Sequence, residues 1–333
     1  MKKWKTGKNL LIIISLISLF LSFGMAQGAE KKEPLSMIAT TFPAYDFAMQ
    51  LTGDEAEVRL LLPPGSESHS YEPTPRDIIA IQNADLFLTV GGESEHWVTE
   101  MLNSMGEQAP RTLAMMDCVT VLAQEKSHSM QEDEHTHTHT HAHTHSHEED
   151  MHINSEVAEL DEHVWTSPKR AKEIVLGISA VLIELRPDMA EEYQGYANAY
   201  LLELDALDKA FETIISQGTR QKIIFGDRFP FRYLAHDYAI SYDAAFPGCS
   251  EDSEPNPQTI ISLIREVQAE EIPVVFYIEF SNRKTADILA EETGAALRLF
   301  HSCHNVTTEE MENGATYLSL MQGNLEMLKE ALE

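Results

Sequence analysis

The chain has 333 residues, of which 43% are hydrophobic and 23% are charged, and its formal charge at pH 7 is −30. So acidic a protein is not expected to bind nucleic acid, because a phosphate backbone requires a basic surface. The length is sufficient for two α/β domains with substantial cores.

Residues 1–28 have the pattern of a secretory signal peptide. Lysine occupies four of the first eight positions, and an apolar run that is broken only by three serines follows at 10–23. Small residues then allow cleavage after Ala26 or Gly28, and no cysteine for lipid attachment follows the run. The run is short for a membrane-spanning helix. We expect an exported protein, in the periplasm or on the outer face of the cell membrane, with an uncleaved anchor as the alternative.

Strand and helix patterns alternate in the first half of the chain. Apolar runs at 37–42, 58–62 and 85–90 predict strands, and segments 44–52, 75–83 and 95–105 predict helices. Strands that are connected through helices pair in parallel. Residues 34–186 are therefore predicted to form an N-terminal α/β lobe.

A histidine-rich segment at 127–152 interrupts this lobe. Its histidines alternate with Thr, Ala and Ser, so the segment cannot form an apolar core and is predicted to be a disordered surface loop. Neutral imidazole binds borderline cations, so the loop is expected to collect several metal ions weakly. The spaced, internal pattern argues against an expression tag. The seven histidines of the alternating tract are His135, His137, His139, His141, His143, His145 and His147.

The second half begins with two helical patterns, from Pro168 to about Leu185 and from Pro187 to about Ile215. A helix of about 30 residues is about 45 Å long, enough to link two lobes. Strand patterns follow at 222–225, 273–278 and 296–300, and helical patterns at 231–238, 258–269 and 285–293. We predict two similar α/β lobes with mainly parallel sheets, at 34–186 and 218–333, joined by one long helix at 187–217.

Three cysteines follow the signal segment. Cys249 and Cys303 have similar local sequences in the C-terminal third, and a disulfide between them is predicted for an oxidising compartment. Cys118, in a largely apolar stretch, is predicted to be a buried free thiol. The alternative is that all three thiols are free.

Two segments place a histidine where a ligand could bind. His69 lies on the proline- and glycine-containing loop 63–75, at the carboxyl end of a predicted strand, where open parallel sheets bind ligands. His163 precedes a predicted helix, and Asp161 is close enough to accept a hydrogen bond from its ring. A single histidine on a loop would ordinarily have no such role.

Along essentially the whole mature sequence the chain resembles the zinc and manganese solute-binding proteins of ATP-driven importers. The matching pieces are Thr40-Thr41-Phe42-Pro43, the loop 63–75, Ala84-Asp85-Leu86, Gly91, Glu95-His96-Trp97, the segment 161–168, Asn198 and Tyr200 of the long helix, and Phe276-Tyr277-Ile278-Glu279. The resemblance implies a metal cleft between the lobes, with His69 and His163 as ligands. It also implies a monomer that passes its metal to a membrane permease.

The chain departs from this family pattern at the other two ligands. Family members commonly have a histidine after the first strand of the C-terminal lobe and a carboxylate after its last strand. Here Asp227 and His301 stand near those places, and an exchange of roles would keep three imidazoles and one carboxylate. The alternatives are that Asp227 pairs with Arg228 or caps a turn, and that His304 faces the cleft in place of His301.

Three nitrogen ligands and one oxygen ligand suit tetrahedral zinc, whereas manganese prefers more oxygen. A site closed by four protein ligands lacks the open position that hydrolysis requires. We therefore expect a zinc receptor of an ATP-binding-cassette importer and no enzyme. A manganese receptor of the same kind, and a surface adhesin with the same fold, are the alternatives.

Overall fold

The computed structural model describes residues 33–67, 71–124, 159–246, 248 and 255–333. The predictions for the signal peptide, His69, the histidine-rich loop and Cys249 therefore lie outside the described residues. Every element discussed below belongs to the unit Leu35–Glu333.

The first sheet contains four parallel strands in the order β2-β1-β3-β4. They are β1 (Leu35–Ala39), β2 (Ala56–Leu60), β3 (Leu86–Thr89) and β4 (Arg111–Ala114), and helices α2 (Phe42–Thr52), α3 (Pro75–Gln82) and α4 (His96–Met105) connect them. All four residues of β3 are buried, as expected for a central strand covered on both faces. Because β1 lies between β2 and β3, the strand order reverses between β1 and β3, and ligands bind at the carboxyl ends of the strands beside such a point.

The second sheet repeats this topology in the order β6-β5-β7-β8. Its strands are β5 (Lys222–Phe225), β6 (Ser241–Ala244), β7 (Val274–Tyr277) and β8 (Ala296–Leu299), and its helices are α7 (Arg232–Tyr238), α8 (Pro257–Ala269), α9 (Lys284–Thr293) and α10 (Thr308–Glu312). The carboxyl ends of β5 and β7 are the second place where the topology favours a ligand.

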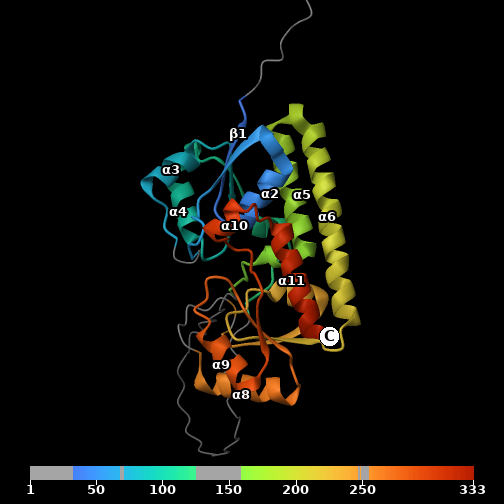
Figure 1. Ribbon diagram of the computed structural model, residues 1–333. Coiled ribbons are helices and arrows are strands. Elements are labelled where there is room, and N and C mark those ends of the chain that lie inside the picture. Colours follow the sequence, from blue (N-terminus) through green and yellow to red (C-terminus); the bar gives the residue numbers. More distant parts are fainter. Residues whose placement is uncertain (1–32, 68–70, 125–158, 247, 249–254) are drawn as a thin grey trace, which may run out of the picture. The chain divides into compact units, whose positions relative to one another are not determined.

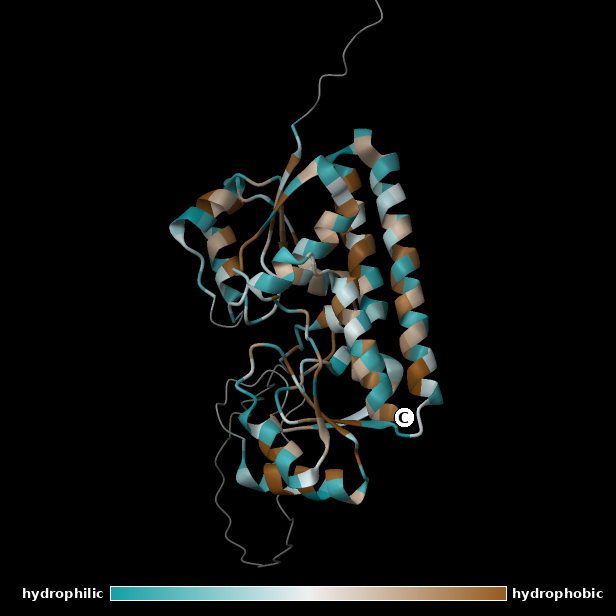
Figure 2. Ribbon diagram, viewed as in Figure 1, coloured by the Kyte–Doolittle hydropathy of each residue, from teal (hydrophilic) through white to brown (hydrophobic). Residues whose placement is uncertain are grey.

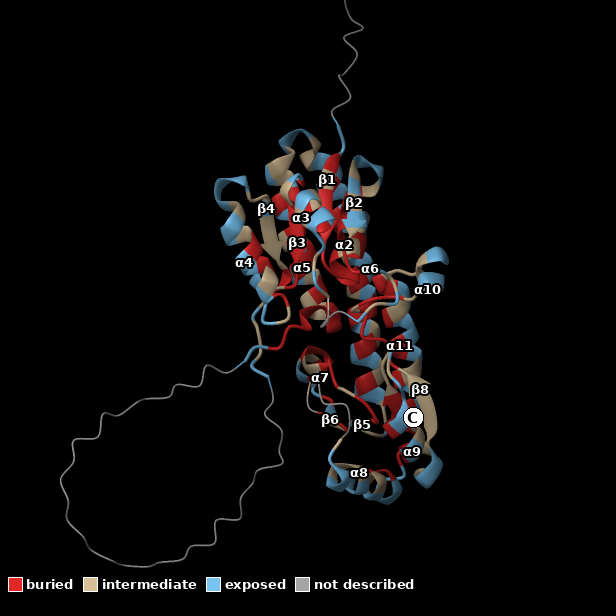
Figure 3. Ribbon diagram, turned by 90° about the vertical axis from the view of Figure 1, so that its left-hand side faces the viewer, coloured by how far each residue is buried: buried red, intermediate tan, exposed pale blue. Residues whose placement is uncertain are grey.

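Helices α5 (Pro168–Leu185) and α11 (Tyr317–Leu332) both pack against the longest helix, α6 (Ala190–Gln217) (Figure 1). In α6 the buried apolar residues recur every three or four positions from Tyr193 to Ile215, so one stripe of the helix faces the core and the rest faces solvent (Figure 2). Figure 3 shows that the inner strands β1, β3 and β5 and the inner faces of these helices are buried, whereas the edge strands β4 and β8 are only partly buried.

The predicted fold is confirmed: two parallel four-stranded sheets with covering helices, and one long helix. The sequence prediction missed the edge strands β4 and β6 and the C-terminal helix α11. No helix in the described ranges combines the length and the apolar character that a membrane span needs.

The structure does not show the predicted disulfide. Cys303 has a free thiol with no exposed surface, and Cys249 is outside the described residues. Cys118 is also free, as predicted, and it is half-buried. Burial, together with Asp117 and Glu173, raises the pKa of the Cys118 thiol to about 11.

Helix α11 was not predicted from the sequence, but it should contribute strongly to the stability of the fold. Leu328 has no exposed surface in the core, so Leu328→Ala should lower the free energy of unfolding by about 2–5 kcal/mol. Leu202 on α6 is 70% exposed, and Leu202→Ala should change it by less than about 0.5 kcal/mol. Chemical denaturation of the full chain measures both, and equal effects would contradict the packing of α11.

Candidate metal centre

Loops from both sheets meet at a small pocket of about 30 Å³. Its lining includes His163, His304 and Glu279, as well as Ser66 and Glu67, which directly precede the segment 68–70 that carries His69. A cavity of this size has room for an ion or a water molecule and not for an organic ligand.

His163 is held in a fixed orientation by Asp161, as the sequence predicted. The Asp161 Oδ1 atom accepts the backbone N–H of His163 at 2.9 Å and lies 3.0 Å from its Nδ1. A carboxylate can only accept, so Nδ1 carries the ring proton and Nε2 has the lone pair that can bind a metal. Both side chains are about 3% exposed.

Glu162, the residue before His163, anchors the loop that follows β3. One of its carboxylate oxygens accepts the Ser94 N–H at 2.7 Å. Gly92 passes so close that a Cβ atom there would lie 2.5 Å from the Glu162 carboxylate, and its φ of +87° is in the left-handed region. The position therefore requires glycine.

His304 lies directly against His163. Their ring centroids are 5.5 Å apart with an interplanar angle of 88°, and the Trp165 ring lies 4.9 Å from that of His304. His304 also lines a second cavity, of about 20 Å³, beside Glu95. The ring of His304 therefore faces the region where the loops of the two sheets meet.

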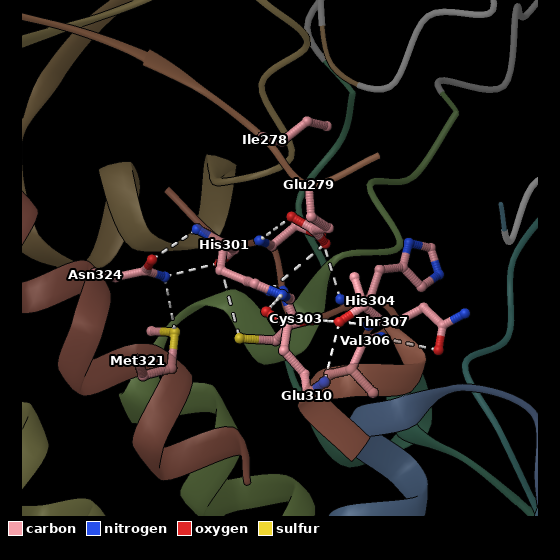
Figure 4. Close-up of polar contacts among 12 residues, drawn as sticks. Ile278, Glu279, His301, Cys303, His304, Val306, Thr307, Glu310, Met321 and Asn324 are labelled. Atoms are coloured by element: carbon pink, nitrogen blue, oxygen red, sulfur yellow. Dashed lines mark hydrogen bonds and ion pairs between the residues drawn. The ribbon is translucent and has the colours of Figure 1, made fainter. Parts of the chain in front are cut away.

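His301 occupies different surroundings, shown in Figure 4. Its Nδ1 accepts the Cys303 N–H at 2.9 Å, and its Nε2 lies 3.7 Å from a carboxylate oxygen of Glu310. Asn324 accepts the His301 N–H at 2.6 Å and donates to the His301 carbonyl at 2.7 Å. His301 is 3% exposed and does not line the pocket that contains His163.

Asp227 lines a larger cavity of about 480 Å³, which shares Glu67, Arg228 and Glu279 with the small pocket. Its carboxylate accepts the backbone N–H groups of Arg228 at 2.8 Å and Ile278 at 3.3 Å. Burial raises the pKa of this carboxyl group against these hydrogen bonds. The cap on the following turn is one of the roles that the sequence left open for Asp227.

Glu279 is the carboxylate that lines the small pocket. It accepts hydrogen bonds from the backbone N–H of Ser302, at 2.7 Å, and from the Ser302 hydroxyl. These two bonds fasten Glu279 to the segment that follows β8. Its place in the pocket also makes it a possible oxygen ligand.

Within the described part of the chain, no three His, Cys, Asp or Glu side chains come close enough to hold a metal ion. His163 and His304 lie together, whereas Asp227 and His301 do not join them in the pocket. The predicted set of His69, His163, Asp227 and His301 stays a prediction, because His69 lies outside the described residues. The sequence signal for His304 was its place three residues after His301.

Each sheet is parallel, and the small pocket with its two imidazoles lies where loops of the two sheets meet. The chain belongs to the family described as zinc-uptake complex component A, periplasmic, whose model matches residues 37–331.

Two curated relatives support this membership. The chain is 32% identical over 335 residues to the high-affinity zinc uptake system protein ZnuA of Bacillus subtilis, covering 99% of this chain and 98% of that protein. It is 31% identical over 323 residues to the zinc-binding lipoprotein AdcA of Streptococcus pneumoniae serotype 4, covering 97% of this chain. The chain spans only about 60% of the length of AdcA.

A solved structure agrees with the family membership. The Zn(II)-bound ZnuA-like domain of Streptococcus pneumoniae AdcA superimposes with a TM-score of 0.71 at 28% identity. The match covers 90% of this chain and 99% of that domain.

Glu95, beside His304 in the second cavity, should make stability depend on pH. Its Oε2 accepts the N–H groups of Val90 at 2.7 Å and Gly91 at 2.9 Å, but burial outweighs these bonds and raises its pKa to about 7. The folded protein therefore binds the proton more tightly than the unfolded chain does. The free energy of unfolding should fall as pH rises from about 4.5 to about 7.

Glu95→Gln keeps the accepting oxygen and removes the titration, so it should reduce this fall by about 1–3 kcal/mol. Burial also raises the pKa of Asp46, to about 6, so part of the fall in the free energy of unfolding should remain in Glu95→Gln. Denaturation at several pH values in the presence of a metal chelator measures the effect. Glu100→Gln on the exposed side of α4 is the control, and an unchanged slope in Glu95→Gln would refute the assignment.

Proposed function

We propose that the chain is an exported zinc-binding receptor that passes zinc to the permease of an ATP-binding-cassette importer. The observation that carries the proposal is the pairing of two imidazoles, the buried His163 and the partly exposed His304, in a pocket of ion size. Membership in a zinc-uptake family and the zinc-binding names of its relatives support the same cargo.

Three histidines supply nitrogen ligands in this proposal: His69, His163 and His304. His69 follows Glu67, which lines the pocket, by two residues in the sequence. His304 replaces His301, the ligand predicted from the sequence, because His304 lines the pocket and His301 does not.

A carboxylate completes the set, and two candidates exist. Asp227 is the ligand predicted from the sequence, and Glu279 lines the pocket itself. Both already accept hydrogen bonds, but an ionised carboxylate has about four acceptor positions, so either can still coordinate a cation. Parallel titrations of Asp227→Asn and Glu279→Gln would identify the ligand, which is the variant with the larger loss of affinity.

This donor set favours zinc over manganese. Three imidazoles and one carboxylate match the tetrahedral geometry of zinc, whereas manganese prefers oxygen-rich, six-coordinate sites. The same set leaves no open position for an activated water, so we propose that the site binds and releases metal without catalysis. The seven histidines between 135 and 147 would raise the local supply of the same ion.

Single histidine substitutions test the ligands. His163→Ala and His304→Ala should each weaken zinc binding more than about 100-fold, because loss of a ligand exceeds the effect of losing a group that merely orients one. His96→Ala, on the exposed side of α4, should leave affinity unchanged. Competition with a zinc chelator, using the full chain with residues 127–152 deleted, measures the affinities. A large loss in His301→Ala with none in His304→Ala would restore the original assignment.

The affinity for zinc should fall as pH drops through about 6.5, because imidazole must lose its proton to bind the metal. Each ligand that protonates below its pKa adds to the steepness, so three histidines predict a fall of more than tenfold between pH 7 and pH 5. Isothermal titration at several pH values provides the measurement. An affinity that stayed constant from about pH 8 to pH 5 would exclude a histidine-based site.

A further inference from the structure

The segment 302–306, which follows the last strand of the second sheet, is bonded mainly to the N-terminal half of the chain. The Trp165 indole N–H donates to the Ser302 carbonyl at 2.8 Å, and the Phe42 N–H donates to the His304 carbonyl at 3.2 Å. The Gly65 N–H donates to the Val306 carbonyl at 2.8 Å. His304 thus sits on a segment that three N-terminal donors hold.

Asn305 makes the most specific of these connections. It is 1% exposed, and its side-chain amide donates to the carbonyl oxygens of Pro63, at 2.8 Å, and Ser66, at 2.9 Å. Its own side-chain oxygen accepts the Val306 N–H at 2.9 Å. All the hydrogen-bonding atoms of this amide are therefore used, and they close the turn 63–66 onto the segment that carries His304.

The opposite side of the segment 302–306 is anchored in the second sheet. Glu279 accepts from Ser302, and the Ser302 hydroxyl accepts the His304 N–H at 3.2 Å. Figure 4 shows His301 on the side of Asn324 and Met321, with His304 on the other side of the segment. The backbone around His304 is thus bonded to both halves of the chain.

We propose that Asn305 is a positioning residue for metal binding: its amide fastens the turn that leads to His69 onto the segment that bears His304. This inference rests on the proposed function. It follows that His163, His304 and the turn 63–66 are held together before the ion arrives, so binding does not have to order them. Ligands that are already ordered bind more tightly than ligands that binding must order.

Two substitutions of Asn305 test the proposal. Asn305→Leu keeps nearly the same shape but cannot donate, and Asn305→Ala removes the group altogether. Both should raise the zinc dissociation constant about tenfold or more, mainly through faster dissociation, because the turn 63–66 is then free to move away. Chelator competition and stopped-flow dissociation on the full chain with residues 127–152 deleted give both quantities. Circular dichroism confirms folding of each variant.

Leu328→Ala provides the control for stability alone. It removes core packing on α11 and should leave zinc affinity and the dissociation rate unchanged. The visible spectrum of bound Co²⁺ adds a readout of ligand geometry: it should change in the Asn305 variants and stay constant in Leu328→Ala.

The outcomes separate this inference from the proposed function. Wild-type affinity and dissociation rate in both Asn305 variants would overturn the positioning role and leave the proposed function intact. An equal loss of affinity in Leu328→Ala would also overturn it, since general destabilisation would then explain the effect. Absence of tight zinc binding in the wild-type chain would overturn both.

Discussion

The site depends on a core that the two sheets share. One hydrophobic cluster contains Met37 and Leu88 of the first sheet, Phe225 and Phe276 of the second, and Leu204 of α6. The opposite faces of the two sheets pack into separate, smaller clusters. The interior is close-packed, so the sheets cannot shift far against the helices without opening cavities. The loops at their carboxyl ends are therefore held near one another.

The buried carboxylate of Asp46 adds directional hydrogen bonds between the helices to this packing. Asp46 on α2 accepts the Tyr317 N–H at 3.0 Å and the Tyr200 hydroxyl at 3.4 Å, which joins α2 to α11 and α6. The Tyr317 hydroxyl in turn donates to the Trp165 carbonyl at 2.7 Å. Trp165 is packed against both pocket histidines, so the polar network leads from the helices to the site. Buried polar groups that are fully bonded in this way specify one arrangement of the core.

The sequence predicted the elements whose signal is local. The long helix has an apolar stripe over its whole length, and the buried strands are apolar runs next to helical segments. The strands β4 and β6 have only four residues each, at the edges of their sheets, with partly exposed side chains, so they lack a continuous apolar run. Helix α11 follows the last predicted strand, and it was missed although it has an apolar stripe of buried residues.

The candidate site was less predictable, because its ligands lie in irregular backbone. His301 and His304 are three residues apart, and no helical or strand period says which of them faces the pocket. Cys303 has a φ of +61°, a left-handed conformation that few non-glycine residues adopt and that alters the direction of the chain between the two histidines. The bonds of Asn305 to Pro63 and Ser66 join residues about 240 positions apart, so no local pattern could indicate them.

In the proposed site, the charges around the small pocket would allow a dication to bind without an oxygen-rich set of ligands. Glu67 and Glu279 line the pocket with Arg228, which lies 3.7 Å from Glu67, so with neutral imidazoles the lining has a net charge of −1. A bound dication then leaves a net charge of +1. A buried charge is costly unless it is paired, and this lining keeps the uncompensated charge equally small with and without the ion. Affinity must then come mainly from the imidazole nitrogens, which is why the positions of His163 and His304 matter more to this site than the overall charge.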